Sequence, residues 1–202
     1  MPLRLQIAVP IVFLLGCAAN SDVAPLDDYQ EVPPVTTLDA PSPQPGQSAP
    51  ASREQASHGQ YLVELLGCGT CHTDGALAGM PNFEKALAGS QTGIAWSNPL
   101  GNEYPGVVYP PNITPDIETG IGLWSDQQIS GAIRAGVGRH GNRRITVMPW
   151  QGYAKISDED VDAITAYLRS IEPVSHQVPD EVAPGQEATA PFVYFGVYES
   201  RN

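Results

Sequence analysis

Apolar residues recur with helical spacing in three segments of the chain, which predicts helices over residues 52–66, 125–136 and 157–172. Gly136 is the expected stop of the second helix, because glycine commonly ends helices. We therefore expect an all-α fold with three main helices, packed into one domain over residues 53–173. The apolar positions that define the three faces are Tyr61, Leu62, Leu65 and Leu66, then Ile129, Ala132 and Ile133, then Val161, Ile164, Leu168 and Ile171.

A serine stands at the predicted start of each helix. Gln55 and Gln128 lie three residues after Ser52 and Ser125, so each pair can form a capping box. The third helix starts at Ser157 and has acids at all three positions of its first turn, which suits the helix dipole. These signals set the expected beginning of each helix.

Residues 18–52 differ sharply in composition from the predicted domain. They are rich in proline and carry five acids but no lysine or arginine. Such a segment cannot bury enough apolar surface to fold, so we predict a disordered, partly extended tether. The five acids are Asp22, Asp27, Asp28, Glu31 and Asp39.

Residues 174–202 form a C-terminal tail that is acidic at first and then aromatic. The run from Pro191 to Tyr198 contains four aromatic residues among eight. Exposing such a run to water is unfavourable. The tail therefore either packs back on the domain as an extended strand or docks a partner, and we favour packing.

Residues 1–17 have the features of an export signal. Arg4 precedes an apolar run over residues 5–16, which is too short for a bilayer span of about 20 apolar residues and is typical of a signal-peptide core. The run ends in Leu-Leu-Gly-Cys at 14–17, which resembles the lipobox of bacterial lipoproteins and predicts lipidation at Cys17. The alternative is an ordinary secretory signal that is cut nearby.

The strongest chemical signal is Cys68-Gly69-Thr70-Cys71-His72, the spacing of a c-type haem attachment site. Each sulfur can form a thioether with one haem vinyl group, and His72 then lies under the iron as an axial ligand. A zinc site would need a second ligand pair at matching spacing. The only other cysteine is Cys17, so no cysteine remains for a second metal pair or a disulfide.

The haem iron needs a second axial ligand, unless that position stays open. Met148 follows His72 by 76 residues and lies on the predicted loop between the second and third helices. A loop there can bring a thioether to the far side of the ring, and Pro149 stiffens it. We therefore predict Met148 as the ligand, with a core methionine as the alternative. The other candidates are Met80, His58, His140 and His176.

The order of these features resembles the single-haem domain of the class I cytochrome c superfamily. The resemblance covers residues 53–174 and is closest to bacterial cytochromes c that accompany membrane-bound dehydrogenases. Many relatives of this kind carry two or three such domains, whereas this chain has one haem motif, and residues 90–104 fit the pattern poorly. The matching residues outside the haem motif are Pro111-Asn112-Ile113-Thr114-Pro115-Asp116, Thr119-Gly120-Ile121-Gly122, Trp124-Ser125-Asp126, Met148-Pro149-Trp150 and Ser157-Asp158-Glu159-Asp160-Val161.

The resemblance implies the cytochrome c fold, in which long loops wrap one covalent haem c. It implies Cys68 and Cys71 as attachment points, with His72 and Met148 as the axial ligands. The segment over residues 75–122 is rich in Gly, Pro and Asn, and wrapping the haem would explain its length.

The chain carries a formal net charge of −12, which disfavours nucleic acid as a partner. The predicted domain has thirteen acids and eight bases, hence about −5, and would be steered toward basic partners. A basic group before Met148 could pair with haem propionates, form a docking patch, or simply be a solvated loop. Its members are Arg139, His140, Arg143 and Arg144.

Ligation by histidine and methionine fills both axial positions and favours the ferrous iron, so we expect an electron carrier and not an enzyme. The favoured function is a single-haem cytochrome c on the periplasmic side of the envelope, anchored to a membrane through Cys17. It would carry electrons from a dehydrogenase or cytochrome complex to an oxidase or other acceptor. The alternatives are a fixed subunit of a membrane complex, and a haem-based gas sensor or peroxidase in which Met148 binds weakly.

Overall fold

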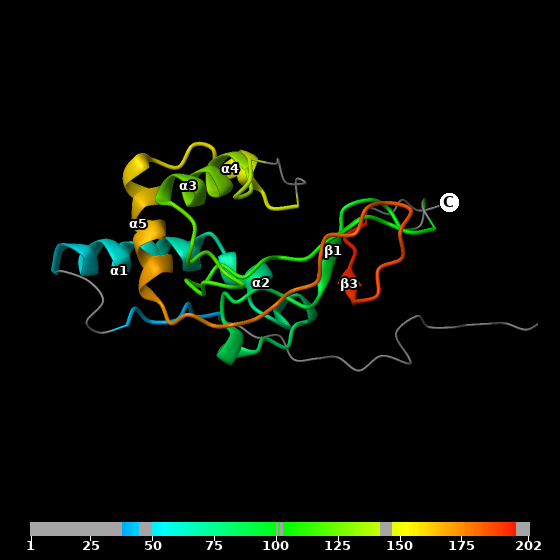
Figure 1. Cartoon of the computed structure of the whole chain (residues 1–202), viewed down its shortest axis with the longest axis horizontal. Coiled ribbons are helices and arrows are strands. Elements are labelled where there is room, and N and C mark those ends of the chain that lie inside the picture. The colour runs from blue at the N-terminus through cyan, green and yellow to red at the C-terminus, as the bar shows by residue number, and fades with distance from the viewer. Residues whose placement is uncertain (1–37, 45–49, 100, 102, 142–146, 197–202) are drawn as a thin grey trace, which may run out of the picture. The chain divides into compact units, whose positions relative to one another are not determined.

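The computed structural model describes residues 38–44, 50–99, 101, 103–141 and 147–196 (Figure 1). Helices dominate this part of the chain, joined by two short 3₁₀ turns and three short strands. The elements in order are α1 (Pro50–Leu65), α2 (Cys68–His72), η1 (Ala76–Ala78), η2 (Phe83–Lys85), β1 (Gly93–Ala95), β2 (Val107–Val108), α3 (Asp126–Ala135), α4 (Trp150–Tyr153), α5 (Asp158–Ser170) and β3 (Phe192–Val193).

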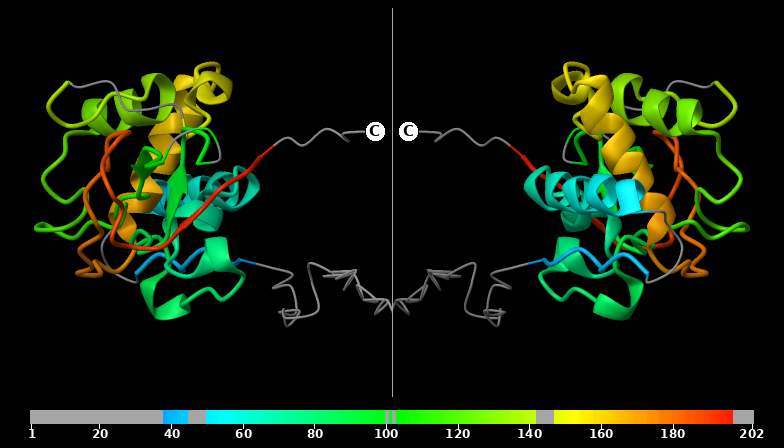
Figure 2. Two further views of the ribbon diagram at one scale, coloured as in Figure 1. Left: turned by 90° about the vertical axis from the view of Figure 1, so that its right-hand side faces the viewer. Right: turned by 90° about the vertical axis from the view of Figure 1, so that its left-hand side faces the viewer.

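Helices α1 and α5 cross closely and form the centre of the core (Figures 1 and 2). Gly59 of α1 makes this crossing possible, because a Cβ at that position would collide with the Ala163 carbonyl oxygen on α5. Tyr167 is fully buried beside the crossing. The core cluster consists of Ala56, Val63, Leu87, Ile121, Ile129, Ile164, Tyr167, Leu168 and Ile171.

The predicted starts of α3 and α5 are confirmed. The Ser125 hydroxyl accepts a hydrogen bond from the Gln128 N–H at 3.2 Å, and the Gln128 side chain accepts one from the Ser125 N–H at 2.8 Å, which is a capping box. Ser157 caps α5 in the same way, accepting from the Asp160 N–H at 3.1 Å. Gly136 ends α3 in the left-handed conformation, with φ of 61°, as expected.

The predicted start of the first helix is wrong by two residues. Helix α1 begins at Pro50, so Ser52 lies within its first turn and is not the N-cap. Proline suits a first turn because a backbone N–H at that position has no partner within the helix, so the lack of one costs nothing.

Residues 38–44 pack against the helices, although their composition predicts part of a free tether. The Tyr167 hydroxyl donates a hydrogen bond to the Pro41 carbonyl at 2.7 Å, and the Gln44 N–H donates to the Ser170 carbonyl at 2.9 Å. The folded domain therefore extends upstream of residue 53.

The predicted signal segment with Cys17, and the remaining tether up to residue 37, lie outside the described residues. Among the helices that the structure does describe, none combines the length and the apolarity needed to cross a bilayer.

A three-stranded sheet in the order β2-β1-β3 adds a feature that the predicted all-α class lacks. Ile94 of β1 pairs with Val108 of β2 in an antiparallel ladder, and Gly93 pairs with Phe192 of β3 in a parallel one. The fold is thus mainly helical with a small sheet, and residues 174–196 of the tail pack on the domain (Figure 1). These strands have two or three residues each, too few to show an alternating pattern in the sequence.

Candidate functional site

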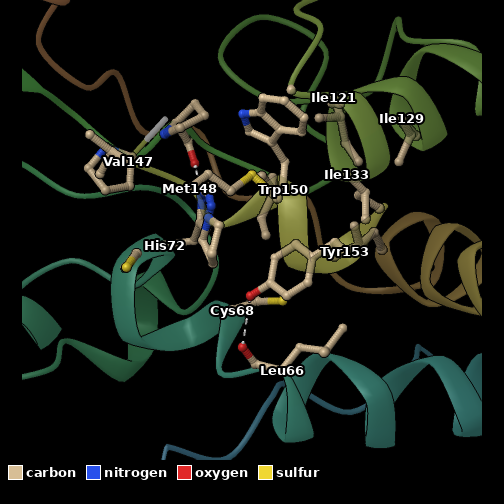
Figure 3. Close-up of a pocket in the computed structure, with 18 of the residues that line it drawn as sticks. Leu66, Cys68, His72, Ile121, Ile129, Ile133, Val147, Met148, Trp150 and Tyr153 are labelled. Atoms are coloured by element: carbon tan, nitrogen blue, oxygen red, sulfur yellow. Dashed lines mark hydrogen bonds between the residues drawn. The ribbon is translucent and has the colours of Figure 1, made fainter. Parts of the chain in front are cut away.

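The Cys-x-x-Cys-His motif forms helix α2, which follows α1 after a sharp turn. Gly67 makes the turn in the left-handed conformation, with φ of 67°, which glycine adopts without steric cost. Helix α2 thereby carries Cys68, Cys71 and His72 within one short element, and all three line a single cavity. Figure 3 labels Cys68 and His72 at this cavity.

This cavity is walled mainly by apolar side chains from distant parts of the chain. Met148 reaches it from the loop before α4, so the predicted second ligand and His72 share the same cavity (Figure 3). Met148 lies 76 positions from His72 and thus meets the motif only through the fold. The aliphatic and aromatic lining includes Val63, Leu66, Ile94, Val108, Ile113, Ile121, Trp124, Ile129, Ile133, Trp150, Tyr153, Ile164 and Leu168.

The His72 ring is held by a hydrogen bond from Nδ1 to the Pro111 carbonyl oxygen at 2.7 Å. A carbonyl oxygen only accepts, so Nδ1 carries the proton in this pair. The neutral ring then has its lone pair at Nε2, the atom that a metal can bind. A hydrogen bond of this kind fixes the orientation of a ligating imidazole and makes it more basic.

The Pro111 carbonyl is positioned by a buried polar corner built on the next residue, Asn112. The Asn112 amide donates to the Thr119 hydroxyl at 2.9 Å and to the Val174 carbonyl at 2.7 Å. Its oxygen accepts from the Thr114 N–H at 2.9 Å and hydroxyl at 2.8 Å. Asn112 and Thr114 are buried. The Asn-Ile-Thr-Pro block therefore fixes the Pro111 carbonyl, and this carbonyl in turn orients the His72 ring.

Asp116 supports the same corner from its exposed side. Its carboxylate accepts hydrogen bonds from the Thr119 hydroxyl and the Thr119 N–H, both at 2.7 Å. These bonds stabilise the charged form and so lower the pKa of Asp116 below its ordinary value. The bond from the Thr119 hydroxyl has the largest effect. The ionised carboxylate thus helps to hold Thr119 in place beneath Asn112.

Burial keeps the two motif thiols uncharged. It raises the pKa of Cys68 to about 11 and raises the pKa of Cys71 as well. Both are free cysteines. Neutral sulfur atoms are compatible with an apolar cavity and with addition to vinyl groups, which forms neutral thioethers.

The loop that carries Met148 is fixed by contacts of the short helix α4. Trp150 packs over Gly136, where a Cβ would lie 2.6 Å from the indole Cδ1. The Tyr153 hydroxyl donates to the Leu66 carbonyl at 3.3 Å and lies beside Cys68 (Figure 3). Burial is the main cause that raises the pKa of Tyr153. Helix α4 therefore links the methionine loop to the end of α1.

The alternative ligands lie elsewhere. Met80 is 64% exposed, and neither it nor His58, His140 or His176 lines the cavity. His176 is buried but donates from Nδ1 to the Ala88 carbonyl at 3.0 Å. Among the described methionines and histidines, the geometry therefore favours His72 and Met148 as the pair.

The basic group before Met148 is only partly described. Arg139 and His140 are exposed, while Arg143 and Arg144 lie outside the described residues. Neither Arg139 nor His140 lines the cavity.

Sequence reasoning missed three contributions to the site. The Pro111 carbonyl was quoted only as part of a matching motif, and its hydrogen bond to His72 depends on a fold contact across 39 positions. Ile94 and Val108 line the cavity from the small sheet. Glu181 lines it from the C-terminal tail, and no local signal in the sequence links this acid to a cavity.

The donor set fits a covalent haem: two thiols, an oriented imidazole and a thioether share an apolar cavity. The profile of the Cytochrome c family matches residues 56–172, more than half of the chain. The chain belongs to this family, whose domains carry electrons. Family membership together with Cys-x-x-Cys at 68–71 implies a covalent haem c.

Several curated relatives are dehydrogenase subunits. The chain is 34% identical to the fructose dehydrogenase cytochrome subunit of Gluconobacter japonicus over 75% of this chain and 27% of the relative. It is 35% identical to the gluconate 2-dehydrogenase cytochrome c subunit of Pantoea cypripedii over 62% of this chain and 25% of the relative. It is 34% identical to the cytochrome c subunit of the quinone alcohol dehydrogenase of Gluconobacter oxydans over 59% and 22%. The chain thus spans about a quarter of the length of these relatives.

Proposed function

We propose that this protein is a single-haem cytochrome c that carries one electron at a time between membrane-associated redox partners. The observation that carries the proposal is the shared cavity, where His72 and Met148 meet the two motif cysteines within apolar walls (Figure 3). In this proposal Cys68 and Cys71 hold the haem, while His72 and Met148 bind its iron. The bound haem supplies a one-electron iron couple.

The protein's own residues would bind the haem iron, bury the haem and orient the axial ligands. The Pro111 carbonyl holds His72, and helix α4 holds the Met148 loop. With both axial positions filled by side chains, no coordination site remains for a substrate, and the apolar walls exclude water. Such a site exchanges electrons and does little other chemistry.

Absorption spectroscopy and intact mass of the protein purified from membranes test this proposal together. One haem bound irreversibly and a sulfur-to-iron charge-transfer band in the far red of the oxidised protein are expected. Rapid binding of carbon monoxide to the native reduced protein would instead favour a gas sensor or peroxidase. Pigment that is extracted by acidified acetone would overturn the covalent attachment.

We further propose that the protein is anchored on the periplasmic side of the envelope through a lipid on Cys17. The support is the Leu-Leu-Gly-Cys sequence that ends the apolar run of the signal segment. Dual or triple acylation of one cysteine provides more than the single chain that binds membranes only marginally. The intact mass of a Cys17→Ser variant is expected to lack the acyl chains that the unmodified protein carries, and an unmodified protein without acyl mass would contradict the anchor.

A second candidate function is a fixed electron-transfer subunit of a membrane dehydrogenase. The printed names of the relatives, which describe cytochrome subunits of dehydrogenases, favour it. Extraction with a mild detergent separates the two candidates. Stoichiometric co-purification of a dehydrogenase would support the subunit, whereas a monomeric cytochrome would support the mobile carrier.

A further inference from the structure

We propose that the small sheet and the tail form a docking surface for a lysine- or arginine-rich redox partner protein. The sheet lobe is defined as the described residues 90–99, 101, 103–109 and 178–196. The proposal rests on the proposed carrier function and adds to it the face through which the electron leaves or enters.

The sheet lobe is one structural unit although its two parts lie far apart in sequence. Besides the β1–β3 ladder, the Val107 and Val182 backbones exchange hydrogen bonds at 2.8 and 2.9 Å. The Tyr109 hydroxyl donates to the Ala190 carbonyl at 2.9 Å, and the Gly185 N–H donates to the Tyr104 carbonyl at 2.9 Å. Figure 1 shows the two segments side by side at one end of the domain. The tail is thus an integral part of the folded domain next to the sheet.

The inner side of the sheet lobe lines the haem cavity. Ile94 and Val108 face the cavity from the sheet, and Glu181 borders it from the tail. The lobe therefore forms part of the cavity wall. A partner seated on the lobe would contact an element that encloses the haem site, and electron transfer requires such proximity.

The charge of the lobe is unbalanced. The lobe contains four acids and no lysine, arginine or histidine, which gives a formal charge of −4. All four acids are exposed, and none has an ion pair within the described chain. Elsewhere in that part of the chain, Lys85, Arg134 and Arg169 pair with acids. The four acids of the lobe are Glu103, Asp180, Glu181 and Glu187.

Exposed aromatic side chains accompany these acids. Phe195 is 76% exposed, and Trp96 and Tyr104 are each 38% exposed. Trp96 is held rigidly, because it packs over Gly106 where a Cβ would collide with the indole. Aromatic residues are enriched at protein interfaces, and complementary charge steers diffusing partners together. Exposed carboxylates and exposed aromatic side chains on the same lobe, part of which lines the cavity, fit a basic redox protein.

The test uses the haem-loaded full chain, reduced, in stopped-flow mixing with a lysine-rich blue copper protein in its cupric form. One electron passes from the ferrous iron to the cupric ion, the blue colour bleaches, and no bond or proton is exchanged. The lobe variant is Glu103→Gln/Asp180→Asn/Glu187→Gln. Glu181 is left unchanged because it borders the cavity and its loss would alter the potential.

At low salt, the lobe variant should react about tenfold more slowly than the unmodified protein and with a weaker dependence on salt. The matched control, Glu54→Gln/Glu84→Gln/Glu159→Gln, removes three exposed acids from elements outside the lobe and should react within about twofold of the unmodified protein. An equal loss in both variants would show that net charge alone matters. A lobe variant that reacts at an unchanged rate would show that the copper protein docks elsewhere. Either result overturns the proposal.

Small inorganic oxidants separate the effect of the lobe's charge from the effect of its aromatic contacts with a partner protein. The lobe variant should react more slowly with the tris(phenanthroline)cobalt(III) cation and faster with ferricyanide. Phe195→Ser should slow only the reaction with the copper protein, whereas Ile117→Ser, at a side chain that is 64% exposed elsewhere, should not. A Phe195→Ser variant that reacts normally with the copper protein would remove the aromatic contact from the proposal. Failure of the unmodified protein to reduce any of these oxidants would instead overturn the carrier function.

Discussion

Replacing Asn112 with alanine should destabilise the protein strongly, because its side chain makes four hydrogen bonds in a corner that is almost fully buried. These bonds are 2.7 to 2.9 Å long, and Asn112 is 2% exposed. At about 1 kcal/mol of net stability for each bond, the variant loses about 4 kcal/mol. That is a large part of the total stability of about 5–15 kcal/mol that is usual for a folded domain.

Urea unfolding of the haem-loaded protein, followed by circular dichroism, measures this loss. With a slope of about 2 kcal/mol per molar urea, the midpoint should fall by about 2 M. The matched control is Asn82→Ala, because the exposed Asn82 side chain accepts one hydrogen bond, from the Glu84 N–H at 3.1 Å. The control should lose less than about 1 kcal/mol. If the two variants unfold at similar urea concentrations, the corner does not stabilise the site as argued.

Three further predictions concern the haem cavity and its support. Met148→Ala should retain the covalent haem but open the sixth position, so reduced protein should bind carbon monoxide rapidly; an unchanged spectrum would mean that another side chain is the ligand. Glu181→Gln should raise the midpoint potential by tens of millivolts, on the order expected for removing one nearby negative charge, and redox titration beside Glu187→Gln shows whether the effect belongs to the cavity. Asp116 has a lowered pKa in the folded state, so its contribution to stability is complete above about pH 4 and disappears as the pH falls further. Asp116→Asn should therefore lose less stability than the unmodified protein between pH 7 and pH 3, and equal losses in urea midpoint would contradict this assignment.

The elements that the sequence predicted are those with strong local signals. Capping residues in the sequence indicate where helices α3 and α5 start, and the spacing of apolar residues indicates which faces are buried. The haem motif is equally local, because its three functional residues lie within five positions. Met148 required an argument about topology, and in the structure it lines the same cavity as the haem motif.

The features that escaped prediction depend on contacts between distant segments. The hydrogen bond from His72 to Pro111 spans 39 positions, and the pairing of Gly93 with Phe192 spans 99. Residues 38–44 have a composition typical of disorder, yet backbone hydrogen bonds and the Tyr167 hydroxyl hold them on the domain. Nothing in the local sequence specifies partners at such separations.

The parallel pairing of β1 with β3 has a practical consequence for anyone who handles this protein. Closing a loop of almost a hundred residues carries a large entropic cost, so this pairing should form late in folding. A purification tag or fusion partner placed after residue 202 would follow the end of β3 by nine residues. Strain on β3 would pass to its partner strand β1, whose Ile94 lines the cavity, so an affinity handle far from the iron in sequence is expected to alter the colour and the redox behaviour of the protein.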